Sequence, residues 1–147
     1  MGANSIVKVA HDLKTKCDEF DRVIEGFKQY KIEGIVPNFF GRDVSYNHIN
    51  TPSLIKQFLW HIHMSIPLNE HPPLWKRIAD IFRRTNHKNA PERDYALIYC
   101  YDELQDIYYL LTIIGPDAHN MKIWQSYLRD VALQAEQLLT RSAMPRD

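Results

Sequence analysis

The stretch that decides the fold runs Tyr95-Ala-Leu-Ile-Tyr-Cys-Tyr101, Asp-Glu-Leu-Gln-Asp, then Ile107-Tyr-Tyr-Leu-Leu-Thr-Ile-Ile114. Two apolar runs rich in β-branched and aromatic residues, separated by a short acidic connection, predict two strands. The second run is the most apolar segment of the chain, so we expect it in the middle of a sheet. Gly115-Pro116 then ends it, because proline cannot continue the hydrogen-bonded ladder.

Two further strands are predicted upstream of this pair. Residues 5–13 open with a β-branched run, which favours a first strand. In the segment Phe-Leu-Trp-His-Ile-His-Met, residues 58–64, the side chains alternate as in a strand, which places His61 and His63 together on one side and the apolar residues on the other. A helix is an alternative for residues 53–59 but fits the two histidines less well.

Apolar residues recur at three- and four-residue steps in two segments, which predicts two helices. The first is an N-terminal amphipathic helix over residues 17–31, with Thr15 as its cap and Gly34 just past its end. The second is a long C-terminal helix from about residue 123 to about residue 141.

Between these elements, turn formers crowd residues 34–53 and predict a long loop, while residues 74–82 fit a short helix. The order strand, helix, three strands, helix predicts an α+β fold. We expect one domain over residues 1–147, flexible at residues 1–4 and 142–147.

The composition limits the function. The 147 residues include 18 basic and 18 acidic ones, and a net charge of zero argues against binding nucleic acid through a general positive field. It leaves room for a local basic patch, and the seven histidines can titrate near neutrality. The two cysteines, Cys17 and Cys100, form no Cys-x-x-Cys pair and are expected to stay reduced. With no signal peptide and no apolar run of about 20 residues, the chain is predicted to be cytoplasmic, with no membrane partner.

Several fragments, taken in order over roughly residues 5–140, resemble the YafO toxin family. They are Phe27-Lys28-Gln29-Tyr30-Lys31 with Gly34, Pro37 followed by Phe40-Gly41-Arg42-Asp43, His61-Ile62-His63, Arg84-Thr85-Asn86, Leu97-Ile98-Tyr99-Cys100, and Pro116 with His119. Two features depart from the family pattern: His87 stands where members tend to have an acidic residue, and a longer polar stretch, 88–94, follows it.

The resemblance implies a RelE/ParE-like fold, a small antiparallel β-sheet packed by helices. It also implies a type II toxin–antitoxin toxin that cleaves mRNA on the translating ribosome and is neutralised by a co-encoded antitoxin. We expect no cofactor, and a homodimer is left open.

Metal-free RNA cleavage uses the 2′-hydroxyl as nucleophile and needs a base, cations near the phosphate and an acid for the 5′ oxygen. Histidine suits the proton transfers and arginine suits the phosphate. The predicted catalytic residues are His61, His63, Arg84, Tyr99 and His119. The predicted substrate-binding residues are Arg42, Asp43, Arg83 and Asn86.

Plainer interpretations compete with these roles. The His-Ile-His pair fits two rim residues, or a zinc site for which no third ligand is evident. Gly41 could permit a tight turn that Arg42 and Asp43 brace, and Tyr99 could be core. For the whole chain, the alternatives are a non-cleaving toxin that blocks the ribosome or a topoisomerase, and a metal-dependent phosphodiesterase.

Overall fold

The computed structural model describes residues 5–10, 13, 19–46, 50–85 and 90–143, and a five-stranded sheet with the order β1-β5-β4-β3-β2 lies at its centre. The strands are β1 (Ile6–Val9), β2 (Phe40–Ser45), β3 (Trp60–Ser65), β4 (Asp94–Asp102) and β5 (Ile107–Ile114). The α+β class is therefore confirmed.

The first strand does not run antiparallel to its neighbour, as the expected antiparallel sheet requires. β1 pairs with β5 in parallel, whereas the other three pairs are antiparallel. β1 joins the open edge of β5 from a distant part of the chain, so no tight hairpin fixes its direction. The sheet is mixed, and the likeness to RelE and ParE stays a prediction.

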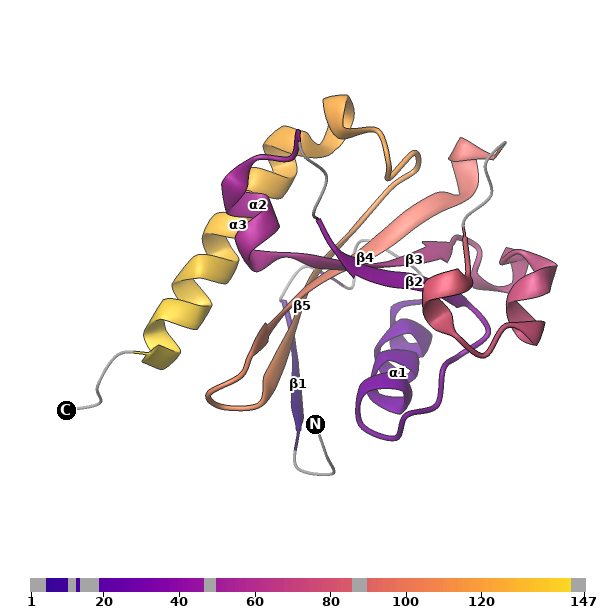
Figure 1. Cartoon of the computed structure of the whole chain (residues 1–147), viewed down its shortest axis with the longest axis horizontal. Helices are drawn as coiled ribbons and strands as arrows, with labels where there is room; N and C mark the ends of the chain where they lie inside the picture. Colours follow the sequence, from indigo (N-terminus) through magenta and orange to yellow (C-terminus); the bar gives the residue numbers. More distant parts are fainter. Residues whose placement is uncertain (1–4, 11–12, 14–18, 47–49, 86–89, 144–147) are drawn as a thin grey trace.

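Helices cover the two faces of this sheet (Figure 1). They are α1 (Phe20–Lys31), α2 (Ser53–Phe58) and α3 (Met121–Ala143). On one face α1 buries Val23 and Phe27 in an apolar cluster with the sheet, which we call the α1 face. On the other, the α3 face, Leu128 and Val131 of α3 pack with Ile55 of α2. The predicted C-terminal helix is confirmed.

The two strands predicted from residues 95–101 and 107–114 are β4 and β5, joined in the longest antiparallel pairing of the sheet. β5 lies between β1 and β4, so it has a neighbour on both sides, as expected. Both strands are mostly buried because helices cover both faces.

Along β3, alternate side chains enter the two different clusters. Ile62 belongs to the cluster on the α1 face, together with Leu97 of β4. His61 and His63 lie on the α3 face, in register with Ile98 and Ala96 of β4. The strand prediction for this segment thus holds from residue 60, while residues 53–58 form α2.

Two segments differ from their predictions. Residues 34–53 are not one loop, because β2 lies within them and is held by pairing with β3. Residues 74–82 do not form a short α-helix but the 3₁₀ helices η3 (Pro73–Arg77) and η4 (Ile81–Arg83). The indole of Trp75 is buried here, and its Nε1 donates to the Thr85 carbonyl at 2.8 Å. This tertiary contact fixes the conformation of the segment, so its α-helical periodicity does not decide its structure.

Other expectations concern the cysteines and membranes. Cys100 is free and buried, and Cys17 lies outside the described residues, as do Thr15 and the chain ends 1–4 and 144–147. Within the described part of the chain, no helix has the length and apolar character that crossing a bilayer requires.

Gly41 is needed for close packing rather than for a turn. It lies within β2, and a Cβ there would come within 2.6 Å of Cζ2 in the Trp75 indole. Any side chain at this position must displace a residue that is 1% exposed. The interpretation of Gly41 as a turn glycine is therefore wrong.

We expect Gly41→Ala to lower the free energy of unfolding by about 1–3 kcal/mol through overpacking, as measured by urea denaturation. Trp75→Phe replaces the indole with a smaller ring that lacks the outer indole atoms Cη2, Cζ2 and Cζ3, which such a Cβ would meet. The double variant should therefore lose less stability than the sum of the two single losses. Strictly additive losses would show that Gly41 and Trp75 are not coupled.

Candidate functional site

A pocket of about 620 Å³ opens on the α3 face, between strands β2, β3 and β4 and the start of α3. Its lining includes His61, His63 and His119 together with Arg42 and Lys122, and we call it the histidine pocket. Two predicted catalytic residues from β3 and one from the loop before α3 therefore come together, with one predicted substrate-binding arginine.

The aromatic rings of the pocket form a continuous row. Tyr46 stacks on His61 with ring centroids 4.0 Å apart, and His61 meets His63 edge-on at 4.8 Å. His63 in turn stacks on His119 at 4.5 Å with an interplanar angle of 15°. The row runs from the buried floor of the pocket to its exposed edge, because the His119 side chain is 55% exposed.

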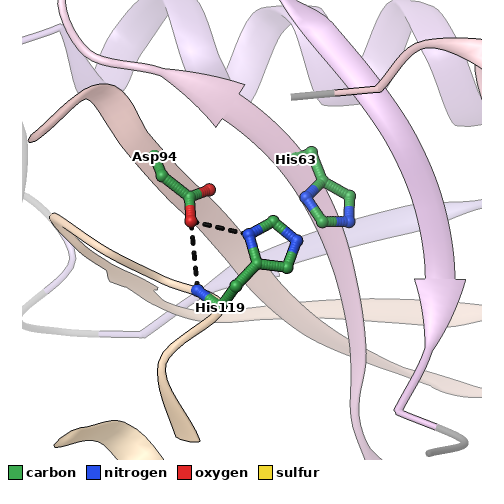
Figure 2. A group of neighbouring side chains, drawn as sticks. All are labelled: His63, Asp94 and His119. Atoms are coloured by element: carbon green, nitrogen blue, oxygen red, sulfur yellow. Dashed lines mark hydrogen bonds and ion pairs between the residues drawn. The ribbon is translucent and has the colours of Figure 1, made fainter. Parts of the chain in front are cut away.

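Asp94 orients His119. Both the Nδ1 and the backbone nitrogen of His119 donate to Asp94 Oδ2, at 2.6 and 3.1 Å (Figure 2). Because an ionised carboxylate only accepts hydrogen bonds, neutral His119 carries its proton on Nδ1 and its lone pair on Nε2. Asp94 is 5% exposed, so a buried anion holds the exposed imidazole in one tautomer and one orientation.

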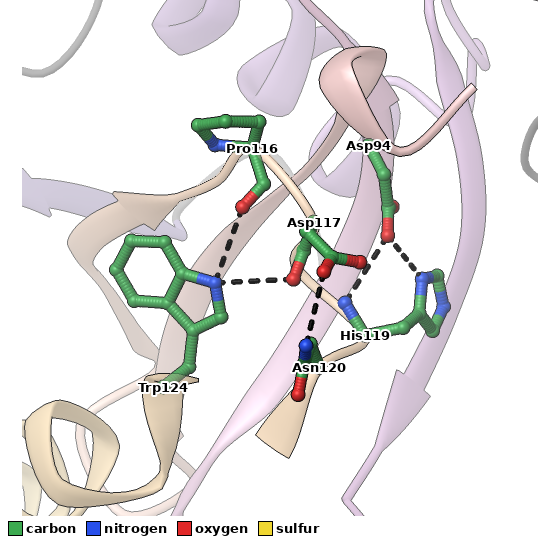
Figure 3. A network of polar contacts seen from close by, with 6 residues as sticks. All are labelled: Asp94, Pro116, Asp117, His119, Asn120 and Trp124. Atoms are coloured by element: carbon green, nitrogen blue, oxygen red, sulfur yellow. Dashed lines mark hydrogen bonds and ion pairs between the residues drawn. The ribbon is translucent and has the colours of Figure 1, made fainter. Parts of the chain in front are cut away.

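The loop between β5 and α3 is held by its own hydrogen bonds (Figure 3). Trp124 Nε1 donates to the carbonyls of Pro116 and Asp117, at 3.3 and 3.1 Å, and Asn120 Nδ2 donates to Asp117 Oδ2 at 3.1 Å. Asp117 adopts a left-handed φ of 59°, which aspartate tolerates better than most residues. His119 therefore extends from a firmly held turn rather than from a free loop.

His61 and His63 are held neutral. Burial lowers the pKa of His61 to about 3, assisted by the charge of His119. Burial also lowers the pKa of His63 to about 2, with further contributions from His61 and His119. The idea that the histidines give the face conditional positive charge therefore fails for these two.

Arg42 supplies a fixed positive charge at the pocket. Its Nε donates to the Phe82 carbonyl at 2.7 Å, and its guanidinium lies over the Phe82 ring, 4.4 Å from the centroid. These contacts use one nitrogen and one face of the guanidinium, which leaves its terminal nitrogens to bind an anion.

Asp43 and Tyr99 lie on the α1 face, away from the histidine pocket. Asp43 accepts hydrogen bonds from Tyr30 and Tyr99, both at 2.7 Å, and from Lys31 Nζ at 2.8 Å. Burial raises the pKa of Tyr99 well above its usual value, with the Asp43 charge adding to the effect. This buried network joins α1 to the sheet, and the structure does not bring either residue to the other predicted site residues.

The Arg84 guanidinium is buried and makes its hydrogen bonds within the protein. Arg84 is 3% exposed, and its guanidinium donates to the carbonyls of Ile78, Pro37 and Phe40 at 2.7–2.8 Å. Arg83 faces solvent, with an ion pair to Asp80 of 3.7 Å, and does not line the pocket. Asn86 lies outside the described residues.

The sequence prediction missed Asp94, which orients His119, and Lys122, which lines the pocket. Asp94 stands before a strand as an ordinary acidic residue, and only its position opposite the loop after β5 shows its partner. Lys122 is the second residue of α3, a position that a helix pattern assigns to solvent. Neither had a spacing signal that could have identified it.

Comparison with known proteins gives two findings. Residues 28–139 match the family described as "Toxin YafO, type II toxin-antitoxin system". A curated relative, the mRNA interferase toxin YafO of Escherichia coli (strain K12), is 29% identical over 126 residues, which cover 84% of this chain and 88% of the relative. No solved structure matches the chain.

Arg84→Ala is expected to act through stability. It leaves three carbonyls without their charged donor, and we expect the free energy of unfolding to fall by about 3 kcal/mol in urea denaturation. The neighbouring Arg83→Ala is the matched control, since an exposed substitution should change stability by no more than about 0.5 kcal/mol. Equal stability of the two variants would contradict the structural role of Arg84.

Proposed function

This chain belongs to the YafO toxin family of type II toxin–antitoxin systems, and from that premise we propose that it is an mRNA interferase whose cleavage site is the histidine pocket. The curated relative is named an mRNA interferase toxin. The observation that supports the pocket most strongly is the pair Asp94–His119, in which a buried carboxylate aligns a half-exposed imidazole. Such a pair suits proton transfer at a substrate in the adjoining space.

In the proposed reaction His119 is the general base. Its Nε2 takes the proton of the 2′-hydroxyl, and the 2′ oxygen attacks the neighbouring phosphorus. Asp94 stabilises the imidazolium that forms, as a buried carboxylate does beside a catalytic histidine. The bond to the 5′ oxygen breaks, which leaves a 2′,3′-cyclic phosphate on one fragment.

The other pocket residues have supporting roles. Arg42 binds the phosphate oxygens through its free guanidinium nitrogens, which stabilises the charge that develops there. His63 stacks beneath the His119 ring and keeps it in place. Because burial keeps His61 and His63 neutral, the departing 5′ oxygen takes its proton from water at the exposed edge of the pocket.

The partners follow from the family and from the charge. Type II systems pair a toxin with an antitoxin, so a cognate antitoxin is implied. A chain with no net charge gains little from electrostatic attraction to RNA, so we propose that the ribosome in the cytoplasm presents the message. A homodimer stays a prediction.

The neutral charge also favours the second candidate, a toxin on this scaffold that blocks its target without cutting. The two candidates differ in one product. Cleavage creates new 5′ ends in messages from expressing cells, and primer extension detects them. A blocking protein arrests translation without such ends.

We expect His119→Gln to lower the rate constant of mRNA cleavage about 10²–10⁴-fold in a purified translation system, because a general base of this kind contributes that much. The side chain is half exposed, and glutamine keeps an N–H donor for Asp94, so the thermal midpoint should stay near that of the wild type.

His71→Gln is the matched control, since His71 stacks on Trp75 and is not among the residues that line the pocket. The His71→Gln variant should cleave mRNA with the wild-type rate constant per folded molecule. A His119→Gln protein that cleaves as fast as the His71 control would exclude His119 as the base.

A further inference from the structure

Folding brings two further candidate ligands, Asp94 and His119, to His63 of the His-x-His segment, while His61 stays outside the set. His63, Asp94 and His119 each offer one donor atom, and these atoms all lie within 4.8 Å of one another. They come from β3, from the start of β4 and from the loop before α3, three parts of the chain brought together only by folding (Figure 2).

The donor set suits a transition-metal ion of intermediate softness. Two imidazole nitrogens and one carboxylate oxygen form a common three-ligand zinc site, in which the fourth position holds water. Calcium and magnesium prefer all-oxygen ligands, so this set disfavours them. The buried His63 is kept in the neutral form, which is the form that ligates.

The geometry requires one small movement. In tetrahedral coordination, with bonds of about 2.0–2.2 Å, neighbouring donor atoms lie about 3.4 Å apart. His63 and Asp94 belong to strands and are 6% and 5% exposed, so they are fixed in place. The stacked His119 ring must rotate to direct a nitrogen between them, which gives up the 2.6 Å hydrogen bond from its Nδ1 to Asp94 in exchange for the bond to the ion. The 55% exposure of the His119 side chain leaves room for that rotation.

We propose that His63, Asp94 and His119 bind Zn²⁺ and that the bound ion inhibits the toxin. Inhibition follows because the ion occupies the carboxylate and the imidazole that proton transfer needs. The same groups cannot both ligate a cation and accept a proton from the 2′-hydroxyl. Arg42 at the pocket adds a repulsive charge, which limits how tightly the cation binds.

The inhibitory part rests on the proposed function, whereas the binding part does not. Binding is therefore measured first, without RNA, by titrating Zn²⁺ into the full chain in competition with a chromophoric zinc chelator. We expect one equivalent to bind with a dissociation constant in the micromolar range or below. His119→Gln and Asp94→Asn should each weaken binding at least about tenfold, since even outer-shell changes at metal sites cost that much.

Two measurements guard against a folding artefact. His119→Gln changes an exposed side chain and should keep the wild-type circular dichroism, so its loss of binding reports the ligand. Zn²⁺ should also raise the thermal midpoint of the wild type and of His71→Gln, but not that of His119→Gln. Unchanged zinc affinity in the His119 and Asp94 variants would overturn the site. So would the absence of zinc binding by the wild type when Zn²⁺ is in about 100-fold excess over about 1 µM protein.

Inhibition is then measured as ribosome-dependent cleavage with Zn²⁺ at saturation, and again after EDTA is added in an amount equal to the zinc, in excess Mg²⁺ so that the ribosomes stay intact. We expect zinc to abolish cleavage and EDTA to restore it. Stimulation by zinc, or cleavage unaffected by saturating zinc, would overturn the inhibitory role. If the protein binds zinc as described but cleaves no RNA after EDTA, the proposed function fails while the metal site stands.

Discussion

The structure depends on the alternation of side chains along β3, a strand buried on both faces. Successive residues of a strand point to opposite sides, so a slip of one residue would exchange the two sets. Such a slip would place Ile62 in the polar pocket and the imidazoles of His61 and His63 against the aromatic rings around Phe27. The pairing of β3 with β4 over six positions prevents it.

This alternation gives the protein two polar systems with different characters. On the α1 face, Asp43 is enclosed by Tyr30, Lys31 and Tyr99, and these three hydrogen bonds are internal to the fold. On the α3 face, Asp94 holds an imidazole whose side chain is half exposed to solvent. A buried acid that only joins a helix to the sheet stabilises the fold. A buried acid that aligns an exposed base can take part in proton transfer to or from a substrate.

Sequence periodicity predicted the elements that carry long apolar patterns: β4, β5, the α3 helix and the placement of His61 and His63 on one face. It missed β2, because a short strand with glycine and charged residues owes its form to its partner β3. The chemistry that RNA cleavage requires and the family resemblance grouped Arg84, Tyr99 and Asp43 with the histidines, because residue type cannot distinguish an internal hydrogen-bonding group from a substrate ligand. Asp94 was missed because its pairing with His119 spans 25 residues and exists only in the folded chain.

The central claim is that the α3 face is reactive and the α1 face structural, and one comparison of two acids tests it most directly. Asp43→Asn and Asp94→Asn are isosteric changes on opposite faces, measured for free energy of unfolding and for mRNA cleavage per folded molecule. The account predicts that Asp43→Asn loses stability but cleaves normally once folded, whereas Asp94→Asn loses about 10²-fold or more in cleavage rate. Loss of cleavage in folded Asp43→Asn, with a normal rate in Asp94→Asn, would contradict it.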